Sequence, residues 1–446
     1  MNILFIQPCP SLKGVNKQRL PFLERLIAKI HLLSPPLSFP TLAALTPKQH
    51  SITMIDERYE KLDFTTPYDL IGITAMTNEV TRAYELADEF RRLGTPVVLG
   101  GPHASALPKE AKEHADSVVI GEAEESWPQL LRELENGKLQ PFYQQPHPTD
   151  IRTIPPPDLS LISRFMLLGG VQSSRGCPYG CKFCFIGNSR DGKVFRKRPI
   201  DQVVQEIRNS KQRIIMFYDS SLTIDLEHTK SLFRAIRGLH KSFICLGNIN
   251  VFTQDDELLR LSKEAGCIQW NIGFESVSQQ SLNDVKKKTN IVEAYNKAIQ
   301  KIHEHKMNVH GFFIFGFDHD TKDIFDKTWE FVQQSKLDSA NFSILTPLPG
   351  TPLFKELEQQ NRILTTDWRQ YGYQRTAVFK TKNLTEKELL EGYKKLYRKY
   401  FNWYAIAKRF FHLVRRDISA SKLIIFFIEN IFTRSYFLYY IYRKRQ

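Results

Sequence analysis

The stretch SRGCPYGCKFC, residues 174–184, places Cys177, Cys181 and Cys184 within eight positions. The chain has 446 residues but only six cysteines, so half of them lie in this one segment. Spacers of three and two residues allow the sulfur atoms to converge, as the ligands of a metal centre must. The stretch therefore predicts a metal-binding loop, and the fold around it has to hold that loop in place.

Several kinds of site could use three such cysteines. Structural zinc usually takes four ligands in two separated pairs, and no second Cys/His pair stands at that spacing in the chain. A 4Fe–4S cluster also takes four ligands, so three cysteines would leave one iron open for another ligand, an arrangement suited to catalysis. Three cysteines acting as small apolar side chains are a further alternative. We expect the cluster, and we expect Cys9, Cys245 and Cys267 to be structural.

The composition is typical of a folded cytoplasmic protein, with 42% hydrophobic and 25% charged residues. No secretory signal peptide is evident, and six cysteines are too few for a disulfide framework, so reduced thiols in the cytoplasm are expected. The net charge of +14 is uneven, because residues 1–150 carry 15 Lys/Arg against 19 Asp/Glu, whereas residues 386–446 carry 14 against 5. A nucleic-acid-binding surface along the whole chain is therefore not expected.

The N-terminal part alternates short apolar runs with amphipathic stretches. Parallel strands are predicted at 3–6, 52–55, 70–74, 97–101 and 118–122, with a helix at 79–94. This alternation predicts an α/β domain over residues 1–143, a doubly wound, Rossmann-like sheet that binds ligands beyond the carboxyl ends of its strands.

Residues 144–160 are rich in proline and are predicted to be a linker. The strands predicted beyond it are 171–175, 214–219, 243–248, 268–275, 309–316 and 340–345. Six strand–helix units without a dinucleotide glycine fingerprint predict a partial (βα)₆ barrel over residues 161–385. The three cysteines follow its first strand, at the end of the barrel where catalytic groups gather.

The cysteine spacing, with Phe183 directly before the last cysteine, resembles the signature of the radical S-adenosylmethionine (SAM) superfamily. Over roughly residues 1–400 the chain is similar to members with an N-terminal cobalamin-binding domain, such as the hopanoid methylases. The other segments that carry this resemblance are PPLSFPTLAAL (35–45), GGPHAS (100–105), GEAEES (121–126), FYDSSLTID (217–225), GFES (273–276), GFFIFGF (311–317) and TPLPGTPLF (346–354).

The resemblance implies three cofactors: a 4Fe–4S cluster on Cys177, Cys181 and Cys184, SAM, and cobalamin. The residues that it implies for SAM are Phe183, Asp219, Glu275, Ser276 and Ile314. The residues that it implies for cobalamin are Thr74, Gly100, Gly101, Pro102, His103, Gly121 and Glu122. Simpler roles stay open for several of these residues. Asp219 could cap a helix, Ile314 could be core, the two glycines could form a tight turn and His103 could lie in a surface loop.

Two features depart from the family pattern. The Asp-x-His-x-x-Gly motif that supplies a histidine to cobalt in other cobalamin proteins is absent, since Glu57 and Arg58 follow Asp56. Cobalamin is therefore expected to bind without a protein histidine on the metal. Ser38 and Phe39 stand where the family commonly has glycine and leucine, which weakens the case for cobalamin relative to SAM.

The resemblance implies an enzyme that methylates an unactivated carbon of a lipid or another small molecule, by way of a 5′-deoxyadenosyl radical and methylcobalamin. A reductase with flavodoxin or ferredoxin is expected as electron donor, and no nucleic acid as partner. A ring closure or rearrangement with the same cofactors is an alternative, and a non-catalytic iron–sulfur protein that passes electrons is another. RNA methylthiolation is disfavoured, because the N-terminal cysteine trio and the C-terminal β-rich domain of those enzymes have no counterpart here.

Residues 386–446 are predicted to form a basic helical extension with a net charge of +9. Its apolar stretch 423–442 is interrupted by Glu429 and Arg434, which argues against a membrane span. Two alternatives stay open for it. An amphipathic helix could lie on the inner face of the membrane, with basic neighbours such as Arg415, Arg416 and Lys422, or a helix hairpin could pack on the barrel.

Overall fold

The computed structural model describes residues 1–9, 36–58, 60–162, 166–372 and 376–434. The N-terminal part is a parallel six-stranded sheet in the order β2-β1-β3-β4-β5-β6. Its strands are β1 (Asn2–Gln7), β2 (Ser51–Asp56), β3 (Leu70–Thr74), β4 (Val97–Gly100), β5 (Ser117–Val119) and β6 (Phe142–Tyr143). The predicted strands are thereby confirmed.

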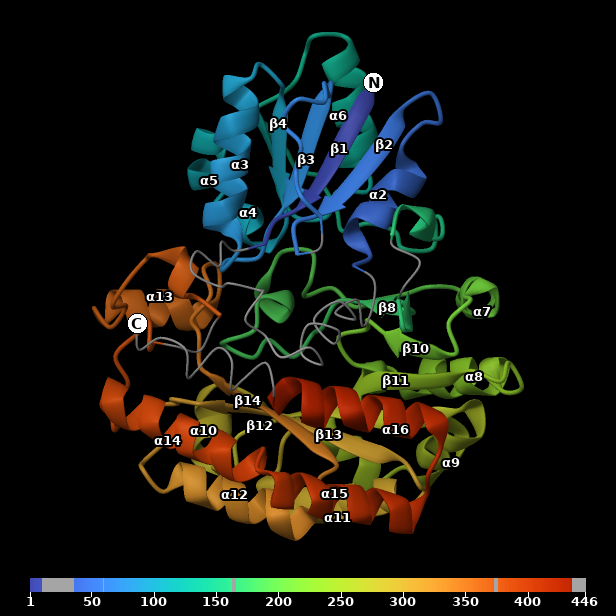
Figure 1. Cartoon of the computed structure of the whole chain (residues 1–446), viewed down its shortest axis with the longest axis vertical. Coiled ribbons are helices and arrows are strands. Elements are labelled where there is room, and N and C mark those ends of the chain that lie inside the picture. Colours follow the sequence, from blue (N-terminus) through green and yellow to red (C-terminus); the bar gives the residue numbers. More distant parts are fainter. Residues whose placement is uncertain (10–35, 59, 163–165, 373–375, 435–446) are drawn as a thin grey trace.

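Helices cover both faces of this sheet (Figure 1). One face packs against α3 (Val80–Arg92), α4 (Pro102–Ala106) and α5 (Pro108–His114), and the other against α2 (Ser38–Leu45) and α6 (Ser126–Glu135). Both faces of the strands are apolar because both are buried, as is usual for parallel sheets. The doubly wound architecture is confirmed.

The second sheet is also parallel, in the order β14-β13-β12-β11-β10-β7, and its two edge strands do not pair with each other. Its strands are β7 (Leu168–Val171), β10 (Ile214–Phe217), β11 (Ser242–Gly247), β12 (Cys267–Glu275), β13 (Asn308–Phe315) and β14 (Ser339–Ile344). The helices between them are α7 (Ile200–Asn209), α8 (Leu226–Ile236), α9 (Asp256–Ala265), α10 (Gln279–Asp284), α11 (Tyr295–Glu304) and α12 (Ile324–Ser335). This is the predicted open barrel.

The first barrel strand differs from the prediction of 171–175. The strand in the sheet is β7, which ends at Val171. Residues Ser174–Arg175 form β8, which pairs antiparallel with β9 (Arg196–Lys197) in a separate hairpin. The apolar pattern around position 171 does not reveal that the chain leaves the barrel sheet there and pairs with β9 instead. The cysteine loop lies between the two strands of this hairpin.

Successive residues of a barrel strand point to opposite faces, so one set packs against the outer helices and the other faces the inside of the barrel. On β12, Trp270 and Phe274 are buried against the outer helices, with the ring of Phe274 4.8 Å from that of Tyr295 on α11. Gly273 and Glu275 belong to the other set of alternate residues. Glu275, at the carboxyl end of β12, is therefore directed towards the inside of the barrel.

The C-terminal helices pack on the barrel. They are α13 (Pro352–Gln359), α14 (Glu386–Tyr400), α15 (Trp403–Arg416) and α16 (Ala420–Phe427), followed by a π-helical turn at Ile428–Phe432. Ile425 of α16 joins an apolar cluster with early residues of four barrel strands: Leu168, Ile214, Ile244 and Ile268. The described part of the tail therefore adopts the arrangement expected of a packed hairpin.

Two basic residues expected to face a membrane are instead paired with acidic side chains, Lys422 buried and Arg416 partly buried. Arg416 forms an ion pair with Asp338, and Lys422 Nζ lies 2.6 Å from Asp417 Oδ2. Residues 435–446, the end of the stretch considered for membrane contact, lie outside the described residues. Among the residues that are described, no helix combines the length and the hydrophobicity that crossing a membrane requires.

Candidate cofactor-binding and active site

The cysteine loop is shaped by hydrogen bonds to its own backbone. The backbone N–H of Cys177 donates to the carbonyl of Gly192 at 2.7 Å. The side chain of Asn188 donates to the carbonyls of Cys181 at 2.8 Å and Cys184 at 2.7 Å, a role that the sequence did not reveal. These bonds fix the chain direction at all three cysteines, so the thiols are positioned before any ligand arrives.

The three thiols lie close enough to affect one another. Burial raises the pKa of Cys181 to about 11, and Cys184 and Cys177 add to the rise while Lys287 opposes it. In the described part of the chain, no three Cys, His, Asp or Glu side chains surround a point where one metal ion would bind. A 4Fe–4S cluster requires wider spacing, because each thiolate binds a different iron. The three thiols of this loop would therefore hold such a cluster with one thiolate on each of three irons.

Glu275 and Ser276 lie where β12 ends. Glu275 has a φ of +62°, and the register with β13 shifts between Gly273 and Glu275. This bend turns the Glu275 side chain back over the strand, so that a Cβ at position 273 would lie 2.3 Å from Glu275 Oε1. A larger residue at position 273 would therefore displace the Glu275 carboxylate from this position. Ser276 is buried, and its hydroxyl accepts a hydrogen bond from the N–H of Ser278.

Lys287 is a site residue that sequence reasoning missed. Its Nζ lies 2.9 Å from Glu275 Oε1, and both side chains are largely buried. Burial opposes the charge on Lys287, but Glu275 and Cys181 outweigh it and its pKa is raised. Lys287 is one of three consecutive lysines in VKKKTN (285–290), and only this one points inward. The structure thus brings a carboxylate and an ammonium group together beside the cysteines.

Phe183 and Ile314 both pack against one apolar cluster at the top of the barrel. The ring of Phe183 lies 6.2 Å from that of Phe317, which follows β13. The structure therefore places these two predicted SAM residues on a shared apolar wall. Their contact with the adenosyl part of SAM stays a prediction.

Asp219 is fully buried at the carboxyl end of β10. Its carboxylate accepts hydrogen bonds from the N–H and hydroxyl of Ser173 and from the hydroxyl of Ser174, and burial raises its pKa. The helix-cap alternative is wrong, because Ser221 caps the following turn and Asp225 caps α8. In this structure Asp219 anchors the strand that leads into the cysteine loop, and direct contact with SAM stays a prediction.

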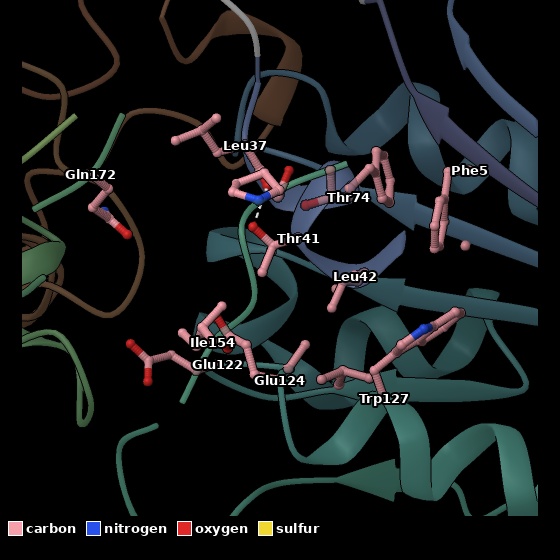
Figure 2. Close-up of a pocket in the computed structure, with 18 of the residues that line it drawn as sticks. Phe5, Leu37, Thr41, Leu42, Thr74, Glu122, Glu124, Trp127, Ile154 and Gln172 are labelled. Atoms are coloured by element: carbon pink, nitrogen blue, oxygen red, sulfur yellow. Dashed lines mark hydrogen bonds between the residues drawn. The ribbon is translucent and has the colours of Figure 1, made fainter. Parts of the chain in front are cut away.

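A cavity of about 360 Å³ lies at the carboxyl ends of β1, β3, β4 and β5 (Figure 2). Five predicted cobalamin residues line it: Thr74, Gly100, Gly101, Gly121 and Glu122. Pro102 and His103 do not. Pro102 begins α4, and His103 is buried with Nε2 3.2 Å from Glu110 Oε1, so it does not lie in a surface loop. No histidine is among the described residues that line this cavity.

Residues that follow the first barrel strand close the other side of the cavity: Gln172, Arg175 of β8, Arg198 after β9 and Glu206 of α7. Arg198 Nη1 donates to Glu206 Oε2 at 2.7 Å, while Arg198 Nε and Glu206 Oε1 are buried with no partner among the described groups. Buried polar atoms without partners are costly, so a ligand with polar groups is expected to meet them. Cobalamin has amide side chains that would pair with such atoms, and the apolar residues of the lining suit its ring system. Ile151, Ile154, Pro155 and Pro157 of the predicted linker form another wall.

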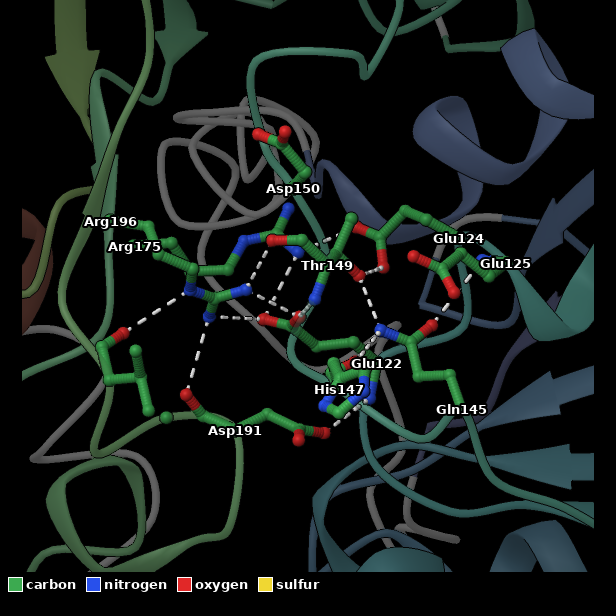
Figure 3. A network of polar contacts seen from close by, with 12 residues as sticks. Glu122, Glu124, Glu125, Gln145, His147, Thr149, Asp150, Arg175, Asp191 and Arg196 are labelled. Carbon is green, nitrogen blue, oxygen red and sulfur yellow. Dashed lines mark hydrogen bonds and ion pairs between the residues drawn. The ribbon is translucent and has the colours of Figure 1, made fainter.

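A polar network joins this cavity to the cysteine loop (Figure 3). Arg196 donates to both oxygens of Glu122 at 2.7 Å, and Arg175 donates to Glu124 at 2.6 Å. Burial opposes ionisation of Glu122, but Arg196 and Arg175 lower its pKa to about 2. Gly121 has a φ of +82°, and Asp191 Oδ2 lies only 2.3 Å from the position that a Cβ would take there. The absence of a side chain at Gly121 therefore lets the Asp191 carboxylate approach the backbone. The loop after β5 and the cysteine loop are therefore held as one unit.

Comparison with known proteins agrees with this arrangement. Residues 171–332 match the radical SAM superfamily, and residues 26–131 match the B12 binding domain. The chain is 32% identical to the bacteriochlorophyllide d C-12(1)-methyltransferase of Chlorobaculum tepidum, over 84% of this chain and 85% of that protein. It is 25% identical to the hopanoid C-2 methylase of Rhodopseudomonas palustris, over 75% and 66%.

A likeness in fold extends to a solved structure. The radical SAM methyltransferase TsrM from Kitasatospora setae, with cobalamin and a 4Fe–4S cluster bound, superposes with a TM-score of 0.63 at 18% identity, over 80% of this chain and 78% of that one. The two domain matches and the relative with 32% identity show the family, and the solved structure agrees with them in fold. The chain belongs to the radical SAM superfamily, in the group whose members carry a B12-binding domain ahead of the radical SAM domain.

Proposed function

We propose that the protein is a cobalamin-dependent radical SAM methyltransferase that adds a methyl group to an unactivated carbon of an apolar small molecule. The observation that carries this proposal is the 32% identity to a bacteriochlorophyllide methyltransferase over more than four fifths of both chains. A saturated carbon has no proton acidic enough for an ordinary base, which is why radical chemistry is required. The cluster with SAM would supply the radical, and cobalamin would carry the methyl group.

The chain's own residues would bind and orient these groups. Cys177, Cys181 and Cys184 would hold the cluster. Glu275 and Lys287 carry opposite charges 2.9 Å apart, so they suit the amino and carboxylate groups of SAM, respectively. Phe183 would pack on the apolar side of the bound molecule. We expect a reductase with flavodoxin or ferredoxin to deliver the electrons.

The substrates named for the relatives give two candidate substrate classes for this protein. A chlorophyll-type tetrapyrrole with alkyl side chains is the first candidate, because the relative that acts on bacteriochlorophyllide is more similar than the one that acts on hopanoids. A polycyclic lipid is the second. Both are apolar molecules with saturated carbons, which agrees with the prediction of a lipid or other small molecule.

The proposal is tested by transfer of a labelled methyl group. Reconstituted protein with a low-potential reductant and SAM bearing a deuterated methyl group is expected to transfer that group intact to a bacteriochlorophyllide-type or hopanoid acceptor, as measured by mass spectrometry. The Cys181→Ala variant is the control and is expected to transfer none. If an acceptor is consumed and 5′-deoxyadenosine forms while no label enters the product, the ring-closure alternative replaces methylation.

A further inference from the structure

The C-terminal helix hairpin exposes large apolar side chains on its outer side. Tyr404, Phe411 and Trp403 of α15 are 81%, 62% and 57% exposed. The other exposed apolar residues of this surface, here named the α15–α16 face, are Val414, Ile418, Ile424 and Phe427. The rings of Phe410 and Phe427 lie 6.4 Å apart, so the two helices contribute to one continuous surface.

The inner side of the same hairpin packs on the rest of the protein. Ile406 and Leu413 of α15 pack with Phe426 of α16 in a small core, and Arg409 is buried with its Nε bonded to Asn430. Helix α15 therefore carries large aromatic side chains on its outer side in addition to the apolar residues that face the protein. Large apolar side chains gathered on an exposed surface mark an interaction site, so the outer side is expected to meet something else.

Positive charge surrounds the α15–α16 face. Lys408 and Arg415 are exposed on α15, and no ion pair is found for either one within the described ranges. Burial lowers the pKa of His412, and Lys336, Lys408 and Arg415 lower it further against the opposing effect of Asp338, so these three cations all lie near the His412 ring. The guanidinium of Arg415 lies 5.6 Å from the ring of Phe411, so charge and apolar surface alternate.

We propose that the α15–α16 face docks on the surface of an anionic lipid bilayer. Tyrosine, tryptophan and phenylalanine insert at the level of the lipid headgroups, and basic side chains beside them pair with anionic phosphates. An acidic protein partner would also meet the charges, but aromatic side chains more than half exposed and interleaved with cations favour the lipid interface. In Figure 1, α15 lies at the end of the molecule away from the N-terminal sheet, so docking leaves the cobalamin cavity free.

Vesicle binding by the full-length reconstituted protein tests this proposal. The protein is expected to sediment with vesicles of phosphatidylcholine and phosphatidylglycerol, to bind pure phosphatidylcholine more weakly, and to be partly released by high salt. Tyr404→Ser with Phe411→Ser is expected to lower the bound fraction about tenfold. The matched control, Leu93→Ser with Leu364→Ser, removes two exposed apolar side chains elsewhere and is expected to bind like the natural protein.

A second pair of variants reverses the charge of exposed basic residues, whose substitution is not expected to disturb folding. Lys408→Glu with Arg415→Glu is expected to abolish the preference for anionic vesicles. Lys109→Glu with Lys138→Glu, exposed lysines of the N-terminal part, makes the same change in net charge and is expected to leave that preference intact. Equal losses in both pairs would mean that overall charge alone drives binding, which overturns the proposal.

Two other occupants of the α15–α16 face, a second copy of the chain and residues 435–446, are tested with the same variant and with a shortened chain. If sedimentation velocity shows a dimer that the Tyr404→Ser, Phe411→Ser variant dissociates, the face joins two copies of the chain and the lipid proposal is overturned. A chain ending at Arg434 checks whether residues 435–446 cover the face. Binding by the shortened chain together with no binding by the full chain would likewise overturn the proposal.

Discussion

Replacing Cys181 by alanine is expected to abolish binding of the 4Fe–4S cluster and, with it, all cleavage of SAM. The loop supplies only three thiolates, so after one substitution two irons would lack a protein ligand. Cys181 is the most buried of the three, 8% exposed, and its backbone carbonyl is bonded to Asn188. Iron and sulfide content after anaerobic reconstitution, followed by an assay for 5′-deoxyadenosine, measures both losses.

Cys245→Ala is the matched control for this experiment. Cys245 is fully buried between β11 and β12, with its Sγ 3.9 Å from that of Cys267, in the barrel core. Its truncation leaves a small cavity that is expected to cost about 1 kcal/mol of folding stability, while the iron content stays unchanged. Full iron content in Cys181→Ala, or loss of iron in Cys245→Ala, would contradict the assignment of the cluster.

Replacing Lys287 by methionine is expected to lower the rate of 5′-deoxyadenosine formation about a hundredfold or more while the cluster is retained. Among the residues that the structure describes, the Lys287 ammonium group is the only ion-pair partner within 3 Å of Glu275. Its loss leaves a buried carboxylate unpaired and removes the partner proposed for the SAM carboxylate. Lys287→Arg keeps the charge and is expected to recover part of the rate.

Lys288→Met is the control for this second substitution, because Lys288 is the neighbouring residue and is exposed. It is expected to keep the rate within about twofold, as surface substitutions away from a site usually do. The Michaelis constant for SAM and the iron content separate a binding defect from a folding defect. A Lys287→Met protein that cleaves SAM at the normal rate would show that Lys287 serves only to neutralise Glu275.

Much of this architecture follows from local patterns in the sequence. Most strands of both sheets are apolar runs of four to nine residues, because a parallel sheet buries both of its faces. The cysteine spacing and GFES (273–276) mark the carboxyl ends of strands, and the structure places Glu275 close enough to Cys181 to contribute to the rise in the pKa of that thiol. Five of the seven residues predicted for cobalamin line one cavity for the same reason.

Other parts of the site depend on contacts between distant segments, which no local pattern contains. Lys286, Lys287 and Lys288 are chemically identical, and only the packing of α10 against the barrel decides which of them points inward. Arg198, which follows β9, and Glu206 of α7 reach the cobalamin cavity from the radical SAM part of the chain. The apolar stretch 423–442 is interrupted by Glu429 and Arg434, so its sequence fits a packed hairpin and a helix on the membrane surface equally well.

The central claim is that one protein uses the cluster, SAM and cobalamin together to transfer a methyl group. The most direct measurement counts the two products derived from SAM during turnover with an acceptor. Methyl transfer through cobalamin predicts S-adenosylhomocysteine and 5′-deoxyadenosine in equal amounts, with both dependent on added cobalamin. Formation of 5′-deoxyadenosine at the full rate without cobalamin and without S-adenosylhomocysteine would contradict the account.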